Sequence, residues 1–172
     1  MRVECKGRRV RFQAGLEELP DGRRILVDRV LFPDSVAVLP VDGDGGIILI
    51  RQYRPSTGEW LLEAPAGTIK EGEAPEEAAR RELLEEAGLE ASELVRVGMG
   101  YVSPGYSTEK MTLYIARGLK PGEARPEYYE AIEGTVKLGL DEALTLVEKG
   151  EIRDVKTILL LYALKALSGD KE

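Results

Sequence analysis

The chain has 172 residues, of which 43% are hydrophobic and 32% are charged, and its formal net charge is −7. This composition is typical of one globular domain and excludes an intrinsically disordered chain. The acidic balance argues against nucleic acid as the main partner, because a nucleic-acid backbone selects basic surfaces.

The first third of the chain has the composition of β-strands. Strands are expected at 8–19 and 23–32, on either side of the turn signal PDG. Residues 35–41 and 46–53 flank the sequence DGDGG, and they are expected to form a second hairpin. A short strand that ends in a loop is expected at 59–67.

The pattern then changes to a helix, expected from Pro75 to Ala87. Pro75 suits a first helical position, and Gly88 suits the residue that ends a helix. Strands return at 94–102, 110–119 and 135–140, and helices are expected at 140–150 and 155–167. This order of elements predicts an α/β sandwich rather than regular βαβ units.

Several classes of chemistry and location are excluded or disfavoured by composition. The chain has no histidine, so any general base must be a carboxylate, a lysine or a tyrosine. Cys5 is the only cysteine, which excludes an intrachain disulfide and favours the cytoplasm. No apolar run approaches the roughly 20 residues of a membrane span, and the start lacks the apolar segment of a signal peptide. The abundance of glutamate and arginine, without asparagine, resembles the composition of thermophile proteins.

Three glutamates of the expected helix share one of its sides. Glu82, Glu85 and Glu86 stand at i, i+3 and i+4, and Gly67 and Gly72 precede the helix in a loop whose carbonyls can face them. Clustered carboxylates and carbonyls suit Mg²⁺ or Mn²⁺. The alternative is a solvated acidic face, which is common on glutamate-rich helices.

This segment resembles the Nudix box. The matching positions are Gly67, Glu73, Arg81, Glu82, Leu83, Glu85, Glu86, Gly88 and Leu89. The resemblance implies an α/β/α sandwich with a mixed sheet, and hydrolysis of a nucleoside diphosphate linked to another group. It implies two or three Mg²⁺ (or Mn²⁺) ions held by Glu82, Glu85, Glu86 and the Ala66 carbonyl. Arg81 and Glu73 are expected to brace the loop against the helix.

The flanks of the box resemble the ADP-ribose pyrophosphatase branch of that family. The sequences are RQYRPSTGEWLLEAPAG and SPGYSTEKMTLYIA, and the resemblance runs from about Val27 to Leu161. It implies cleavage of ADP-ribose to AMP and ribose 5-phosphate, with Pro104 at the position of a substrate-site proline. It also implies an N-terminal antiparallel β extension at 1–34 that joins two subunits and helps form the pocket, before a hydrolase domain at 35–172.

Other side chains are candidates for substrate contact and for water activation. Arg51 and Arg54 end a strand before the box, and guanidinium groups fit phosphate oxygens; the alternative is that one only pairs with surface acids. Glu63 is expected to accept a ribose hydroxyl or to support the metal ligands. By resemblance, the base lies among Glu127, Glu130 and Glu133, with Glu130 the first choice.

Three matters stay open at the level of sequence. The residue that stacks on adenine is one of Phe32, Trp60, Tyr101 and Tyr106. The substrate is alternatively another sugar nucleotide, a dinucleoside polyphosphate or an oxidised nucleotide. A non-catalytic binding module with the same fold is a further alternative, although such modules usually lose box acids and this chain keeps them.

Overall fold

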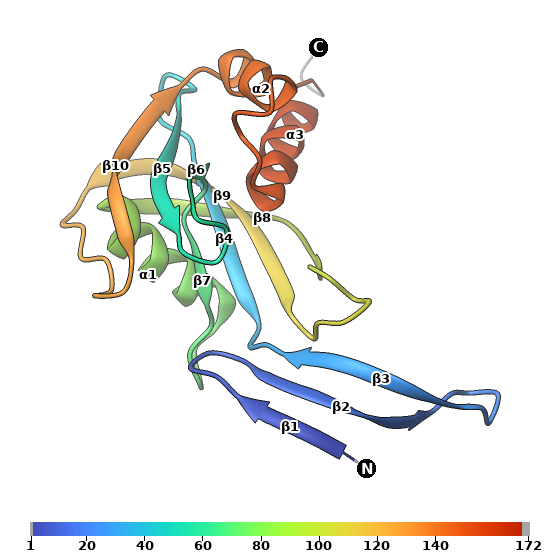
Figure 1. The fold of residues 1–172 in the computed structure, drawn as a ribbon. Helices are drawn as coiled ribbons and strands as arrows, with labels where there is room; N and C mark the ends of the chain where they lie inside the picture. The colour runs from blue at the N-terminus through green and yellow to red at the C-terminus, as the bar shows by residue number, and fades with distance from the viewer. Residues whose placement is uncertain (1, 170–172) are drawn as a thin grey trace.

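The structure, a computed structural model, describes residues 2–169 (Figure 1). The strands are β1 (Arg2–Lys6), β2 (Arg11–Glu18), β3 (Arg24–Leu31), β4 (Ser35–Pro40), β5 (Ile47–Arg54), β6 (Glu59–Glu63), β7 (Ala66–Thr68), β8 (Leu89–Tyr101), β9 (Lys110–Pro121) and β10 (Ala131–Leu138). The helices are α1 (Pro75–Ala87), α2 (Leu140–Glu148) and α3 (Val155–Gly169).

The body of the molecule is an α/β/α sandwich. One sheet has the order β7-β4-β9-β8 and is parallel only between β4 and β9; the other has the order β10-β5-β6 and is antiparallel. Val36 and Val38 of β4 pack in the core under α1, whereas Ala37 and Leu39 pack in the core shared with α3. Because successive side chains of a strand point to opposite faces, β4 is buried on both sides. The predicted fold class is confirmed.

The first three strands form a sheet of their own that projects from the body (Figure 1). The β2–β3 hairpin was predicted, whereas β1, which pairs with β2, was not. The sheet joins the body at Val30, whose N–H donates to the Tyr106 carbonyl over 2.7 Å and whose carbonyl accepts from Thr108 over 3.1 Å.

The predicted hairpin of β4 and β5 is wrong. The DGDGG turn forms, with Asp42 N–H donating to the Gly46 carbonyl over 2.8 Å, and an isolated bridge joins Val41 to Ile47. Beyond that bridge the strands separate into different sheets, where β4 pairs with β7 and β9. Both strands are largely buried, so each is more stable between two partners than at the edge of a hairpin.

The helix that carries the clustered acids has the predicted bounds. Glu77 accepts a hydrogen bond of 2.9 Å from the Ala74 N–H at its start, and Gly88 ends it in the left-handed conformation, with a φ of 64°. Strand β10 begins at Ala131, earlier than expected, so Glu133 lies in a strand and not in the loop. No helix among residues 2–169 is both long and apolar enough to cross a membrane.

Candidate active site

Arg81 connects the loop, strand β7 and helix α1. Its Nε and Nη2 donate to the two carboxylate oxygens of Glu73 over 2.7 and 2.9 Å, and Nη2 also donates to the Thr68 carbonyl over 3.1 Å. Hydrogen bonds from Arg81 are the main cause that lowers the pKa of Glu73 to about 2. The expected brace between Arg81 and Glu73 is therefore present.

The three box glutamates divide between two sets of contacts. Arg81 Nη1 lies 2.6 Å from Glu82 Oε1 and 3.1 Å from Glu85 Oε2, so one guanidinium group stands between these two carboxylates. Glu86 turns instead toward β7, where its Oε2 accepts from the Ala66 N–H over 2.8 Å. Within residues 2–169, no three side chains of the acidic, cysteine or histidine type converge as ready metal ligands.

Glu82 and Glu86 are nevertheless suited to a cation, because both are buried, at 6% and 3% exposure. Glu86 Oε1 is buried and accepts no hydrogen bond from the described residues. Burial, with smaller contributions from the charges of Glu82 and Glu130, raises the pKa of Glu86 to about 8. Burial also raises the pKa of Glu82. A hard divalent cation would add counter-charge to both carboxylates and would give the unpaired Oε1 of Glu86 a partner.

Gly67 allows the strand to approach these acids. A β-carbon at this position would overlap the carboxylate of Glu82, so any larger residue would displace that side chain. The box glycine therefore has a packing role, which is to bring the backbone of β7 within reach of buried carboxylates.

A cavity of about 520 Å³ opens beside β7. Its wall includes residues 66–68, whose backbone contacts Glu82 and Glu86. Arg54 and Glu63 line the cavity beside this wall, and Phe32 and Tyr101 are its aromatic members. Pro104 lines a neighbouring hollow with Tyr106, and that hollow shares Phe32 and Tyr101 with the cavity.

Arg54 faces this cavity while it is held by Glu63. Its Nε and Nη2 donate to the two oxygens of Glu63 over 2.8 and 2.7 Å, and Glu63 is only 1% exposed. The ammonium group of Lys156 also donates to Glu63 Oε2. Burial alone would raise the pKa of Glu63, but the hydrogen bonds of Arg54 and the charge of Lys156 hold it below its ordinary value. Glu63 is thus a buried anion shared by two cations.

The start of α3 fixes this group, and sequence reasoning missed it. Asp154 caps the helix by accepting from the Thr157 N–H over 3.0 Å and from its hydroxyl over 2.5 Å. Thr157 Oγ1 accepts in turn from the Ala64 N–H over 2.7 Å, and Lys156 lies 2.9 Å from Asp154. The available signal was an aspartate three residues before a threonine at the start of a helical pattern.

The structure does not bring Arg51 to the cavity. Its guanidinium group pairs with Glu133 and lies 4.8 Å from the centre of the Trp60 ring. Arg51 and Arg54 are three residues apart on one strand, so they point to opposite faces. Of the two arginines, Arg54 alone lines the cavity.

Glu130 ends the loop 122–130 and lies close enough to the acids of α1 for its charge to act on Glu82 and Glu86. Its side chain is 11% exposed, and its Oε2 accepts from the Glu127 N–H over 2.9 Å. Its charge adds to the effects that raise the pKa of Glu82 and of Glu86, after burial. This proximity favours Glu130 over Glu133, which pairs with Arg51, but its role as the base stays a prediction.

The sequence and the fold of the chain are similar to those of known proteins. Residues 31–161 match the family model described as "NUDIX domain". A curated "ADP-ribose pyrophosphatase" of Bacillus subtilis (strain 168) is 37% identical over 155 residues, covering 87% of this chain and 80% of the relative. A "Methanol dehydrogenase activator" of Bacillus methanolicus is 34% identical over 164 residues, covering 92% and 86%. A solved structure described as "Crystal structure of ADP compounds hydrolase" superposes with a TM-score of 0.86 at 26% identity, covering 99% of this chain and 94% of that one.

The raised pKa of Glu86 predicts an unusual dependence of stability on pH in metal-free protein. The folded chain keeps this proton up to about pH 8, whereas the unfolded chain releases it near 4.5. The free energy of unfolding should therefore fall as pH rises between these values, by at most about 1.4 kcal/mol per pH unit from this group. Urea unfolding in chelator at several pH values measures the slope.

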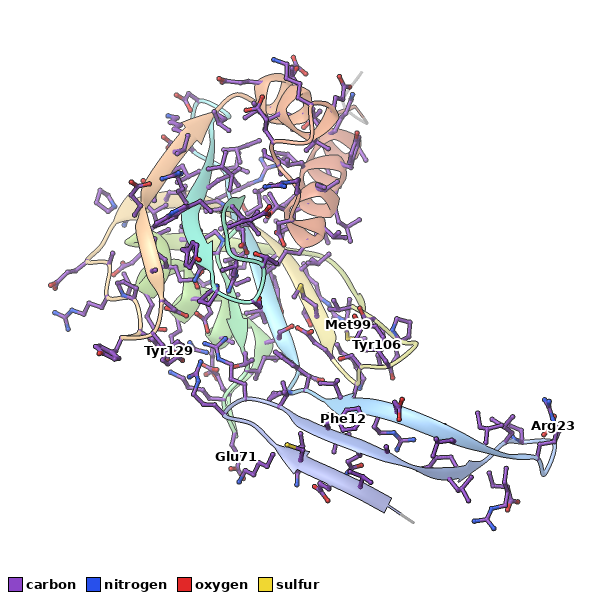
Figure 2. The ribbon with its side chains drawn as sticks, in the orientation of Figure 1. Phe12, Arg23, Glu71, Met99, Tyr106 and Tyr129 are labelled. Carbon is purple, nitrogen blue, oxygen red and sulfur yellow. The ribbon has the colours of Figure 1, made fainter. Side chains whose placement is uncertain are left out.

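Glu86→Gln should flatten that slope, because the amide does not titrate. Glu71→Gln, which changes an exposed acid of the same loop–helix segment, is the matched control and should keep the wild-type slope (Figure 2). Equal slopes in wild type and Glu86→Gln would show that Glu86 is not held protonated in the fold.

Proposed function

The chain belongs to the Nudix family, and from this premise we propose that it hydrolyses the diphosphate of ADP-ribose to AMP and ribose 5-phosphate with a divalent metal. The observation that carries the substrate is 37% identity to an ADP-ribose pyrophosphatase over most of both chains. The box acids, the adjoining cavity and the arginine at its wall are what such a hydrolase needs.

We propose that Glu82, Glu85, Glu86 and the Ala66 carbonyl hold two or three Mg²⁺ or Mn²⁺ ions. When bound, such ions neutralise charge on phosphoryl oxygens and acidify a water molecule. The unpartnered Oε1 of Glu86 and the burial of Glu82 support this ligand set. The contacts of Arg81 Nη1 with Glu82 and Glu85 are the ones a cation would replace, while its other two nitrogens keep Glu73.

The chain's own residues account for the proton and for the leaving group. Glu130 accepts a proton from the attacking water, whose oxygen bonds to one phosphorus as the bridging P–O bond breaks. The leaving phosphate oxygen gains negative charge, and Arg54 stabilises that charge. Arg54 Nη1 makes no hydrogen bond to residues 2–169, and Glu63 and Lys156 hold the rest of the group in place. No covalent enzyme intermediate is required.

In this proposal, aromatic residues of the cavity bind the nucleoside part of the substrate. Phe32 and Tyr101 line the main cavity and are the preferred partners of adenine by stacking. Pro104 and Tyr106 lie in the adjoining hollow. Trp60 is a poorer choice, because its ring already packs with Arg51 and Tyr53.

The cellular setting is proposed from composition. A single cysteine, Cys5, suits the reducing cytoplasm. The excess of glutamate and arginine without asparagine suits a heat-stable enzyme.

A product assay tests the proposed reaction. With Mg²⁺ or Mn²⁺, we expect ADP-ribose to be cleaved faster than GDP-mannose, NADH or 8-oxo-dGTP, giving AMP and ribose 5-phosphate. Glu86→Gln should fold and lose at least ~10³ in turnover, on the scale of removing one preorganised electrostatic group. Glu71→Gln is the control and should retain activity. Faster cleavage of another compound would contradict the assignment of ADP-ribose as the substrate. Near-normal turnover of Glu86→Gln would contradict the proposed set of metal ligands.

We also propose that the extension at 1–34 joins two copies of the chain and completes the pocket. The register of β1–β3 places Val3, Cys5, Phe12, Leu16 and Leu26 on one face of this sheet. All are exposed, with Leu26 at 69% and Leu16 at 51%. These exposed apolar side chains share the face with Asp28, and their number on a projecting sheet favours association.

The oligomeric state tests this part of the proposal. Sedimentation velocity at micromolar concentration should give a dimer for the wild type and a monomer for Leu16→Asp/Leu26→Asp, whose changes lie on the apolar face. Ile25→Asp changes a residue of similar polarity on the opposite face and should remain dimeric. A monomeric wild type would remove the proposed dimer.

A further inference from the structure

The turn between β1 and β2 contacts the loop that carries Glu130. Two consecutive arginines of the turn lie over one ring, with the guanidinium carbons of Arg8 and Arg9 at 3.7 and 4.7 Å from the centre of Tyr129. Arg9 Nη2 also lies 3.9 Å from Glu130 Oε1. Figure 2 shows Tyr129 where the projecting sheet meets the body. Segments more than 110 residues apart are thus brought together next to the proposed base.

The first half of the loop 122–130 is held by backbone hydrogen bonds to α1 and its cap. Gly122 N–H donates to the Gly88 carbonyl over 2.8 Å, and Arg125 N–H donates to the Glu85 carbonyl over 2.9 Å. The second half closes on itself, since Glu130 N–H donates to the Glu127 carbonyl over 2.8 Å and Glu130 Oε2 accepts from Glu127. This closed turn contacts the N-terminal extension through Arg8 and Arg9.

We propose that Arg8, Arg9 and Tyr129 form a latch that holds the turn 127–130, and with it Glu130, toward the carboxylates of α1. These three are positioning residues and act through Glu130. The inference rests on the proposed function for the role of Glu130 as base. In addition, the N-terminal extension would set the position of the Glu130 carboxylate.

Attractive contacts offset the repulsion between the two cations of the latch. Two guanidinium groups near one another repel, but the face of the Tyr129 ring attracts both, and Glu130 offsets the charge of Arg9. Arg9 is also one of the residues that line the main cavity. Loss of the ring would remove the contact of both guanidinium groups with the loop, leave only the ion pair of Arg9 with Glu130, and loosen the turn.

The neighbouring tyrosine provides a matched control. Tyr128 is fully exposed, whereas Tyr129 is 45% exposed and lies under the arginines. Tyr129→Leu removes the ring, Tyr129→Phe keeps it, and Tyr128→Leu makes the same change one residue away. None of these positions supplies a proposed metal ligand.

Hydrogen–deuterium exchange of 122–130 and steady-state kinetics on ADP-ribose test the latch. Tyr129→Leu should exchange faster at 127–130 and lower kcat about tenfold, with KM and Mn²⁺ affinity unchanged. Tyr129→Phe and Tyr128→Leu should behave like wild type in exchange and kcat. Equal behaviour of Tyr129→Leu and Tyr128→Leu would overturn the proposal.

A double-mutant cycle shows whether the latch acts through Glu130. In a Glu130→Gln background, Tyr129→Leu should cause little further loss of kcat, because the positioned group is already gone. An unchanged tenfold loss in that background would overturn the proposed positioning role. Failure of the proposed function would differ: the wild type would cleave no diphosphate, while exchange in Tyr129→Leu would still rise.

Discussion

The ion pairs of Arg81 are the interaction on which the site depends. One guanidinium group binds both oxygens of Glu73, the Thr68 carbonyl, and the carboxylates of Glu82 and Glu85. It therefore connects the loop of Glu73, strand β7 and helix α1. Its positive charge also offsets the repulsion between the carboxylates of Glu82 and Glu85. Arg81 and Glu73 are only partly buried, at 18% and 14% side-chain exposure, so losing one partner should cost less than the roughly 3–5 kcal/mol typical of a fully buried pair. Glu86 lies outside this network, and its buried Oε1 has no hydrogen-bond partner among residues 2–169.

Strand β7, the start of α3 and the N-terminal extension contribute residues to the cavity wall, and α1 contacts β7 through Glu86. Helix α1 supplies the acids, and β7 approaches them closely because Gly67 has no side chain. The start of α3 anchors Glu63 through Lys156 and Thr157, which in turn orients Arg54. The extension reaches the loop of Glu130 through Arg8 and Arg9. In the proposed reaction, the residues that would contact the substrate, hold the metal and act as base therefore come from separate elements.

Local signals predicted much of this arrangement. Pro75 and Gly88 marked both ends of α1, since proline suits the first turn and glycine the left-handed cap. The spacing of Glu82, Glu85 and Glu86 put them on one side, and strand alternation explains why Arg54 but not Arg51 lines the cavity. What could not be predicted depends on distant partners. The β4–β5 turn exists without its hairpin, and Lys156 meets Glu63 from 93 positions away.

The central claim is that buried carboxylates of α1 bind a divalent cation and give up a proton to do so. Calorimetric titration of the wild type with Mn²⁺ near pH 7, repeated in buffers of different ionisation enthalpy, measures proton release directly. Because the pKa of Glu86 is raised to about 8, binding should release close to one proton, and Glu86→Gln should lose that release and bind more weakly. Tight binding without proton release, with the same affinity in Glu86→Gln, would contradict the account.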